Sequence, residues 1–295
     1  MEENILSIIE SFIQAIVQGL TEFLPVSSSG HLSLVQHFFG VNGESAVFFT
    51  ILLHLGTLVA VFIAFRELIW KLIKEFFSMI KDIFTGKFSF KKMNPERNMI
   101  IMLIIALLPL IPVYFFKDFF TGVASDADIV VEGICFLYTA TILFLSDRCG
   151  HGKKTIGQIN TRNALTIGIF QCVALLPGVS RSGSTISAGL FCGLSRKTAV
   201  EFSFVLGIPA IIGGCLSEFG DLNAEGVASI GIAPMIIGFV VSAVVGFLAI
   251  KLVQWLINSD KFKIFAIYTA ILGVIVLVLG IIEHVSGQTI MQMIA

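Results

Sequence analysis

Six apolar segments, each about as long as a membrane-spanning helix, confine this chain to folds that cross a lipid bilayer. A transmembrane helix needs about 20 mostly apolar residues. The segments cover residues 46–65, 99–116, 129–146, 199–216, 233–256 and 264–282. Of the 295 residues 56% are hydrophobic and only 13% are charged, and the mean hydropathy of +0.95 lies far above that of a soluble domain. We therefore expect an all-α polytopic membrane protein with a single integral membrane domain.

Two other apolar regions, residues 5–39 and 164–194, are interrupted by proline, glycine and serine, and they carry related motifs. The first motif reads QGLTEFLPVSSSGH at 18–31, and the second reads QCVALLPGVSRSGS at 171–184. A constant offset of 153 relates Ser27 to Ser180 and Gly30 to Gly183, and it relates later residues of the two halves as well. This spacing predicts an internal repeat, with copies at about 1–147 and 160–285, and a functional site at its polar core.

The distribution of basic residues predicts the orientation, because cytoplasmic loops retain Lys and Arg. The loop from Arg66 to Arg97 holds eight of the 19 basic residues, and we place it in the cytoplasm. Region 164–194 lies between Arg162 and Arg196 on the same side, so we expect a re-entrant helix pair there. Region 5–39 is then either a single irregular span or a second re-entrant pair that enters from outside, and the repeat favours the pair. The expected fold is an inverted-topology repeat with six transmembrane helices plus two re-entrant helix pairs.

Several other features have structural interpretations. The net charge of −1 gives no electrostatic case for nucleic acid, and the five cysteines lack any metal-binding spacing. Apolar residues interleave with lysines within 66–92, which predicts an amphipathic helix on the anionic inner leaflet; a plain basic loop is the alternative. We expect core hydrogen bonding from His54, and an interfacial salt bridge from Glu201 near Arg196 and Lys197.

Glu22 is the first candidate for chemistry, because an unpaired charge inside a membrane is costly. Gln18 precedes it by one helical turn, so their side chains share a helix face. A metal ion or a proton relay would compensate the carboxylate. An ion pair with Arg181 or His31 that only joins two helix tips would do so too. Mg²⁺ or Ca²⁺ is chemically reasonable, since Mg²⁺ takes one or two protein carboxylates together with substrate phosphates.

Hydroxyl groups lie close to an imidazole in the first motif. Ser27 and Ser28 come shortly before His31, and this arrangement can provide a nucleophile with its base. Serines at the start of a helix are more often caps, so this reading depends on the surrounding motif.

The second motif has the composition of a phosphate grip. Arg181 can bind a phosphate through two parallel hydrogen bonds, and a helix N-terminus beside it favours an anion. A snorkelling arginine is the alternative. The flanking residues expected to assist Arg181 are Ser180, Ser182, Gly183 and Thr185.

Together the two motifs closely resemble the signature motifs of the undecaprenyl-pyrophosphate phosphatase (bacitracin resistance) family. The likeness extends to AVEFSF at 199–204 and to the order of the spans, so it covers nearly the whole chain. It implies a multi-pass enzyme of the bacterial cytoplasmic (inner) membrane, whose site opens to the outer face. Such an enzyme hydrolyses undecaprenyl pyrophosphate to undecaprenyl phosphate and inorganic phosphate with Mg²⁺ or Ca²⁺. It recycles the carrier lipid for peptidoglycan synthesis and confers bacitracin resistance.

The resemblance also implies roles for individual residues. Glu22 is then a metal or acid/base residue, Ser27 or Ser28 the nucleophile, and His31 its proton partner. Arg181 becomes the centre of the pyrophosphate clamp. The residues assigned to substrate binding are Gln18, Ser180, Ser182, Gly183 and Thr185. Gln18 stands where many members have a second glutamate, which puts a two-carboxylate metal site in doubt.

Transport is the rival function. Inverted repeats with broken helices near the bilayer midplane are typical of secondary transporters, and a phosphate grip there would also suit a lipid-phosphate flippase. An anion channel is a weaker third option, because only one arginine lies within the apolar regions. Membrane lipids are expected partners, and the sequence leaves open both the oligomeric state, a homodimer included, and the choice between serine and water as nucleophile.

Overall fold

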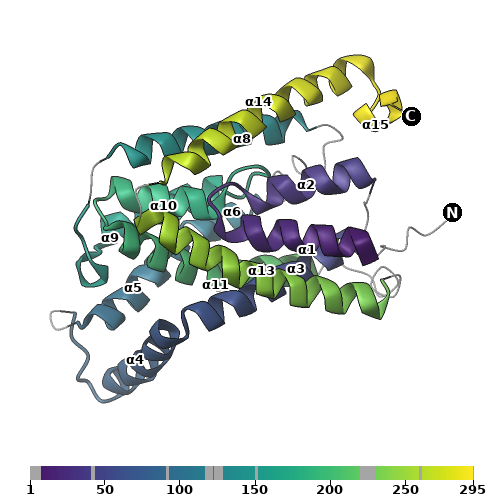
Figure 1. The fold of residues 1–295 in the computed structure, drawn as a ribbon. Helices are drawn as coiled ribbons and strands as arrows, with labels where there is room; N and C mark the ends of the chain where they lie inside the picture. Colours follow the sequence, from purple (N-terminus) through teal and green to yellow (C-terminus); the bar gives the residue numbers. More distant parts are fainter. Residues whose placement is uncertain are drawn as a thin grey trace.

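The computed structural model describes residues 8–40, 44–90, 93–116, 122, 129–149, 152–219, 230–258 and 261–294, and these are mostly helical (Figure 1). The helices are α1 (Ile8–Phe23), α2 (Ser28–Phe39), α3 (Glu44–Ala64), α4 (Arg66–Phe84), α5 (Pro95–Leu107), α6 (Leu110–Tyr114), α8 (Val130–Asp147), the 3₁₀ turn η1 (Ile156–Gln158), α9 (Thr161–Val173), α10 (Arg181–Phe191), α11 (Arg196–Phe219), α13 (Ile232–Asn258), α14 (Lys263–Ser286) and α15 (Ile290–Ile294).

Within the residues that the structure describes, six helical stretches are long and apolar enough to cross a membrane. They run Ser45–Ala64, Pro95–Tyr114, Val130–Asp147, Arg196–Glu218, Ile232–Ile257 and Lys263–Ser286. Each coincides with one of the six segments expected from the sequence, and the boundaries differ by only a few residues. The prediction of an all-α polytopic membrane protein is confirmed. The inverted topology and the re-entrant passage of the two interrupted regions stay predictions.

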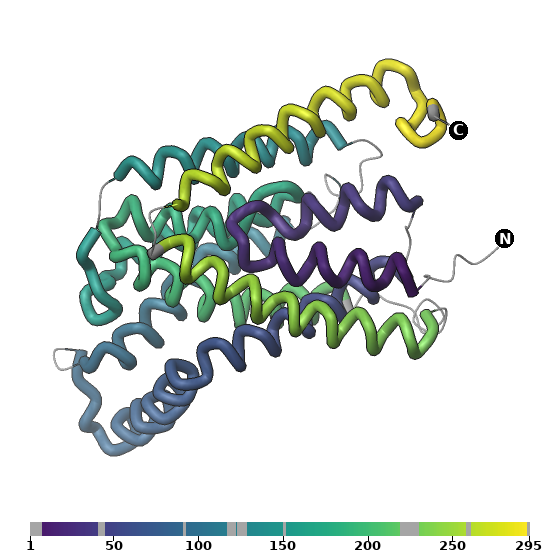
Figure 2. Tube along the Cα trace, viewed as in Figure 1, coloured from purple at the N-terminus to yellow at the C-terminus, as the bar shows by residue number. Residues whose placement is uncertain are grey.

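Both interrupted regions fold as helix hairpins. The first consists of α1 and α2, and the second of α9 and α10 (Figures 1 and 2). Pro25 and Pro177 lie in the turns, where proline stops a helix by removing a backbone donor. Ser27 and Ser180 then cap the second helix of each pair. Their hydroxyls accept hydrogen bonds from the backbone N–H of Gly30 at 3.3 Å and of Gly183 at 3.0 Å.

The longer helices hold the hairpins in place. In the middle of Figure 1, α1 packs along α13, which packs along α3, and at the top α14 packs along α8. The two hairpins meet beside α8. A Cβ atom on Gly30 would lie 2.6 Å from the Phe136 ring and 2.8 Å from the Cα of Gly178. Glycine at position 30 therefore permits the first hairpin to touch both the second hairpin and α8.

The basic segment after α3 contains the expected amphipathic helix, α4. One side of it is fastened to α5 through Arg97, whose guanidinium binds Glu75 at 2.6 Å and Asp82 at 2.8 Å. Trp70 and Phe77 on this helix are more than half exposed. The helix is confirmed, and its contact with the inner leaflet stays a prediction.

Candidate active site

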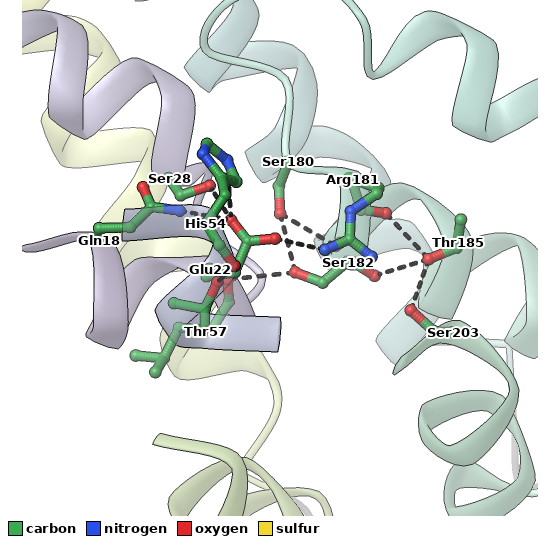
Figure 3. Close-up of polar contacts among 12 residues, drawn as sticks. Gln18, Glu22, Ser28, His54, Thr57, Ser180, Arg181, Ser182, Thr185 and Ser203 are labelled. Carbon is green, nitrogen blue, oxygen red and sulfur yellow. Dashed lines mark hydrogen bonds and ion pairs between the residues drawn. The ribbon is translucent and has the colours of Figure 1, made fainter. Parts of the chain in front are cut away.

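The carboxylate of Glu22 and the guanidinium of Arg181 meet between the two hairpins. Glu22 lies in the last turn of α1, and Arg181 is the first residue of α10 (Figure 3). Glu22 Oε1 accepts a short charge-assisted hydrogen bond from Arg181 Nη2. The Glu22 side chain is only 4% exposed, so its charge is compensated inside the protein. The structure thus joins the two charged residues that the motifs single out.

The second oxygen of this carboxylate has three polar neighbours. Gln18 Nε2 donates to Glu22 Oε2 at 2.9 Å, and the Ser28 hydroxyl donates to the same oxygen at 2.6 Å. His54 Nε2, on α3, lies 3.7 Å from it. Three elements of the first half thereby converge on one carboxylate (Figure 3). The hydrogen bond from Ser28 places a potential nucleophile directly on a potential base.

Serine hydroxyls connect the second hairpin to the first. Ser182 donates to the backbone carbonyl of Leu24 at 3.2 Å, and the hydroxyl oxygens of Ser180 and Ser182 lie 3.3 Å apart. Ser180 is also the cap of α10, so backbone N–H groups and Arg181 face the same region. A helix N-terminus beside a guanidinium is a favourable environment for a phosphate group.

Thr185 and Gly207 lie next to Arg181, the first beside its backbone and the second beside its guanidinium. The Thr185 hydroxyl lies 2.6 Å from that of Ser203 and donates to the backbone carbonyl of Arg181 at 2.9 Å. Gly207 on α11 leaves room for the guanidinium, because a Cβ atom there would lie 2.2 Å from Arg181 Nη1. Thr185 is therefore placed to support the arginine.

His31 occupies a different position from the one its sequence spacing suggests. Its Nδ1 is 2.7 Å from the carbonyl oxygen of Ser27, and its Nε2 is 2.8 Å from the hydroxyl of Tyr268 on α14. Both ring nitrogens are engaged by these groups, and Ser28 is bonded to Glu22 instead. The expected pairing of a serine with His31 is replaced by a serine–glutamate pair, and a proton-transfer role for His31 stays a prediction.

Ser27 has an unusual backbone conformation. Its φ of 74° is the only positive φ of a non-glycine residue in the described parts of the chain. Such a conformation costs on the order of 1–3 kcal/mol and is concentrated at functional sites. The Ser27 hydroxyl caps α2 and lies 3.3 Å from that of Ser29. Its position indicates that it shapes the turn that carries Ser28.

Sequence reasoning missed the contact of His54 with Glu22. The expected core hydrogen bond is present, since Nδ1 lies 2.9 Å from the Thr50 carbonyl oxygen. The contact of His54 Nε2 with Glu22 depends on how α3 is rotated against α1. This rotation cannot be inferred from the spacing of residues in the sequence. The salt bridge expected of Glu201 is confirmed, with Lys197 Nζ at 3.9 Å.

The site has a limited set of metal ligands. Among the described residues no group of three His, Cys, Asp or Glu side chains could hold a metal ion. Glu22 supplies a carboxylate, and Gln18 Oε1 is a buried oxygen with no hydrogen-bond partner. Two hard oxygen donors fit Mg²⁺ or Ca²⁺ when substrate phosphates complete the coordination.

Two comparisons with known proteins point to the same family. Residues 11–275 match the family described as bacitracin resistance protein BacA. The undecaprenyl-diphosphatase of Alkaliphilus metalliredigens is 39% identical over 274 residues, which cover 92% of this chain and 98% of that protein. Undecaprenyl-diphosphatase 4 of Bacillus thuringiensis subsp. konkukian is 37% identical over 272 residues, which cover 92% of this chain and 96% of that protein. The undecaprenyl-diphosphatase of Methanosphaera stadtmanae is 39% identical over 282 residues, which cover 94% of this chain and 99% of that protein. A match of this extent shows that the chain belongs to the bacitracin resistance protein BacA family.

Proposed function

We propose that this protein is a membrane-embedded phosphatase that hydrolyses undecaprenyl pyrophosphate to undecaprenyl phosphate and inorganic phosphate. The curated relatives are named for this activity and align along nearly their whole length. The observation that carries the proposal is the buried cluster of Glu22, Ser28 and Arg181, which combines a base, a hydroxyl and a phosphate-binding group. The product is the carrier lipid of peptidoglycan synthesis, and its recycling accounts for resistance to bacitracin.

Substrate binding involves an exchange of partners at Arg181. Without substrate, its guanidinium binds the carboxylate of Glu22. The terminal phosphate of the pyrophosphate takes the place of that carboxylate, because a guanidinium binds phosphate through two parallel hydrogen bonds. The N-terminus of α10, capped by Ser180, adds backbone N–H donors. Glu22 is thereby released to accept a proton.

The Ser28 hydroxyl then attacks the terminal phosphorus. Its proton passes to Glu22 Oε2, to which it is already hydrogen-bonded at 2.6 Å. The bond from phosphorus to the bridging oxygen breaks, and that oxygen leaves on undecaprenyl phosphate. Water hydrolyses the resulting phosphoserine, which releases inorganic phosphate and restores the hydroxyl. Arg181 stabilises the charge that develops on the phosphoryl oxygens.

Glu22 and Gln18 Oε1 are the protein groups that would hold a Mg²⁺ or Ca²⁺ ion. When bound, such an ion would neutralise part of the pyrophosphate charge. Gln18 has a single amide oxygen to offer, and its nitrogen is committed to Glu22 at 2.9 Å. The protein would therefore bind the ion weakly until the phosphates arrive.

The same proposal includes a location. The protein lies in the cytoplasmic membrane with the Arg66–Arg97 loop inside, the isoprenoid tail stays in the bilayer, and the pyrophosphate reaches the hairpin turns from the outer face. Support comes from the basic loop and from the six apolar helices.

Phosphate release tests the function directly. Purified protein in detergent receives undecaprenyl pyrophosphate with Mg²⁺ or Ca²⁺, and inorganic phosphate is measured over time. We expect multiple turnovers of release. A folded protein that binds the substrate without releasing phosphate would favour the transporter, and vesicles loaded with undecaprenyl phosphate would then be assayed for lipid transfer between leaflets.

A further inference from the structure

One face of α1 carries a buried polar stripe that leads to Glu22. Ser11, Gln14 and Gln18 recur at helical spacing, and each is 0% exposed. Three of their side-chain atoms have no hydrogen-bond partner within the described parts of the chain: Ser11 Oγ, Gln14 Nε2 and Gln18 Oε1. Buried polar atoms in native proteins are nearly always paired with protein or with ordered water. An unpaired polar stripe in the apolar interior of a membrane protein therefore calls for a ligand.

Contacts between side chains extend this stripe across α2 and α3. Gln36 Nε2 donates to Gln14 Oε1 at 3.3 Å and lies 3.2 Å from the Thr50 hydroxyl oxygen. The carbonyl oxygen of Thr50 is bonded to His54, whose other ring nitrogen faces Glu22. Figure 3 shows the last part of this series, where Gln18 and His54 surround the carboxylate. The polar groups are thus continuous from Gln14 to the catalytic cluster.

The chemistry of these side chains selects the ligand. The amides and hydroxyls of Ser11, Gln14, Gln36 and Thr50 are neutral, and all of them can both donate and accept hydrogen bonds. Water matches such groups, because a buried water typically makes about 3 hydrogen bonds to otherwise unpaired polar groups. A phosphate ion would lose its hydration here without meeting a cationic side chain from this set. Gln36 and Thr50 are partly exposed, so the stripe reaches the surface of the protein between α2 and α3.

We propose that Ser11, Gln14, Gln36 and Thr50 form a water-binding track that delivers the hydrolytic water to Glu22. This inference rests on the proposed phosphatase function, since every turnover consumes one water molecule. The proposed track would serve both mechanisms, since water attacks the substrate directly in one and the phosphoserine in the other. It also explains why α1 carries two glutamines and a serine where apolar side chains would pack at lower cost.

The first test replaces Gln14 by a side chain of similar length without polar atoms. Purified Gln14→Met in nanodiscs is compared with wild type for kcat, KM and thermal midpoint. We expect kcat to fall about ten-fold with KM within about two-fold, because the substrate does not contact this residue. The thermal midpoint should change little, since removal of the unpaired Gln14 Nε2 offsets the loss of the hydrogen bond from Gln36 to Gln14 Oε1.

Gln171→Met is the matched control. Gln171 on α9 is the repeat counterpart of Gln18, is 2% exposed, and has no hydrogen-bond partner for either amide atom among the described residues. The Gln171→Met enzyme should keep kcat within about two-fold of wild type, and its thermal midpoint should stay equal or rise, because two unpaired polar atoms are removed. A Gln14→Met enzyme with wild-type kcat, with a raised KM alone, or with a loss equalled by Gln171→Met would overturn the track while leaving the phosphatase function intact.

A labelling experiment provides a readout that does not depend on activity. Ser11→Cys and Ala60→Cys place thiols at two positions that are both 0% exposed, the second within the apolar core. A small methanethiosulfonate reacts with the thiolate, which forms only where water reaches the cysteine. Peptide mass spectrometry separates these thiols from the five native cysteines. We expect faster labelling at position 11, and equal rates at positions 11 and 60 would contradict the track.

Discussion

At the scale of single residues, the site depends on one carboxylate with four polar partners. Burial makes an unpaired charge costly, and losing one partner of a buried ion pair typically costs about 3–5 kcal/mol. Arg181 balances Glu22, so removal of either residue alone would leave a buried charge without its partner. The same two residues are assigned to catalysis, and function and stability are therefore coupled at this position.

The Ser28 hydroxyl is predicted to be the nucleophile. Ser28→Ala removes it while Glu22, Gln18 and Arg181 stay in place, so kcat should fall by at least about 10³-fold with KM nearly unchanged. Phosphate release and a substrate-binding assay together check this. Ser286→Ala at the far end of α14 controls for purification and handling. A Ser28→Ala enzyme within about ten-fold of wild-type kcat would instead assign the attack to water.

The metal proposal makes a prediction at Gln18. Gln18→Glu adds a second carboxylate one turn before Glu22, which should lower the half-saturating Mg²⁺ concentration by about ten-fold. Chelation by EDTA should abolish phosphate release in both enzymes, and added Mg²⁺ or Ca²⁺ should restore it. Release that persists after chelation would refute metal dependence, and an unchanged Mg²⁺ requirement in Gln18→Glu would place the ion elsewhere.

At the scale of helices, the close approach of the two hairpins brings Arg181 to Glu22. Gly30→Ala would push α2 away from Phe136 and Gly178, and overpacking of this kind costs about 1–3 kcal/mol. We expect a lower thermal midpoint together with reduced kcat. Gly213→Ala in α11 is the control, because nothing lies within 4 Å of a Cβ atom there. Equal thermal midpoints for the two variants would show that the hairpins are not tightly packed.

The sequence predicted the helices better than the contacts between them. Length and hydropathy are local properties, so the six spans and the two interrupted hairpins could be read directly. The two polar motifs contain both charged residues of the site, so these residues could be identified from the sequence. The partners of His31 and His54 could not be read, because Tyr268 and Glu22 lie on other helices whose rotation is set by packing. Gly207 was missed for the same reason, since its lack of a side chain matters only beside Arg181.

At the scale of the whole molecule, the distribution of basic residues together with the order of the spans predicts which loops lie on which side. Lys87, beyond the end of α4, should face the cytoplasm, whereas Ser286, at the end of α14, should face outside. Both residues are exposed, so cysteines there can be labelled. A membrane-impermeant maleimide should label Ser286→Cys in intact spheroplasts and Lys87→Cys only in inverted vesicles. Labelling of both from the same side would contradict this topology.

The central claim is that Glu22 and Arg181, contributed by the two hairpins, form one phosphatase centre. Its most direct test is phosphate release from undecaprenyl pyrophosphate by wild type, Glu22→Gln, Arg181→Gln and the double variant, each confirmed to be folded by gel filtration and thermal midpoint. We predict that each single substitution lowers kcat/KM by about 10³-fold or more, and that the double variant is hardly worse than either. Single variants within about ten-fold of wild type, or losses that multiply in the double variant, would contradict a shared centre.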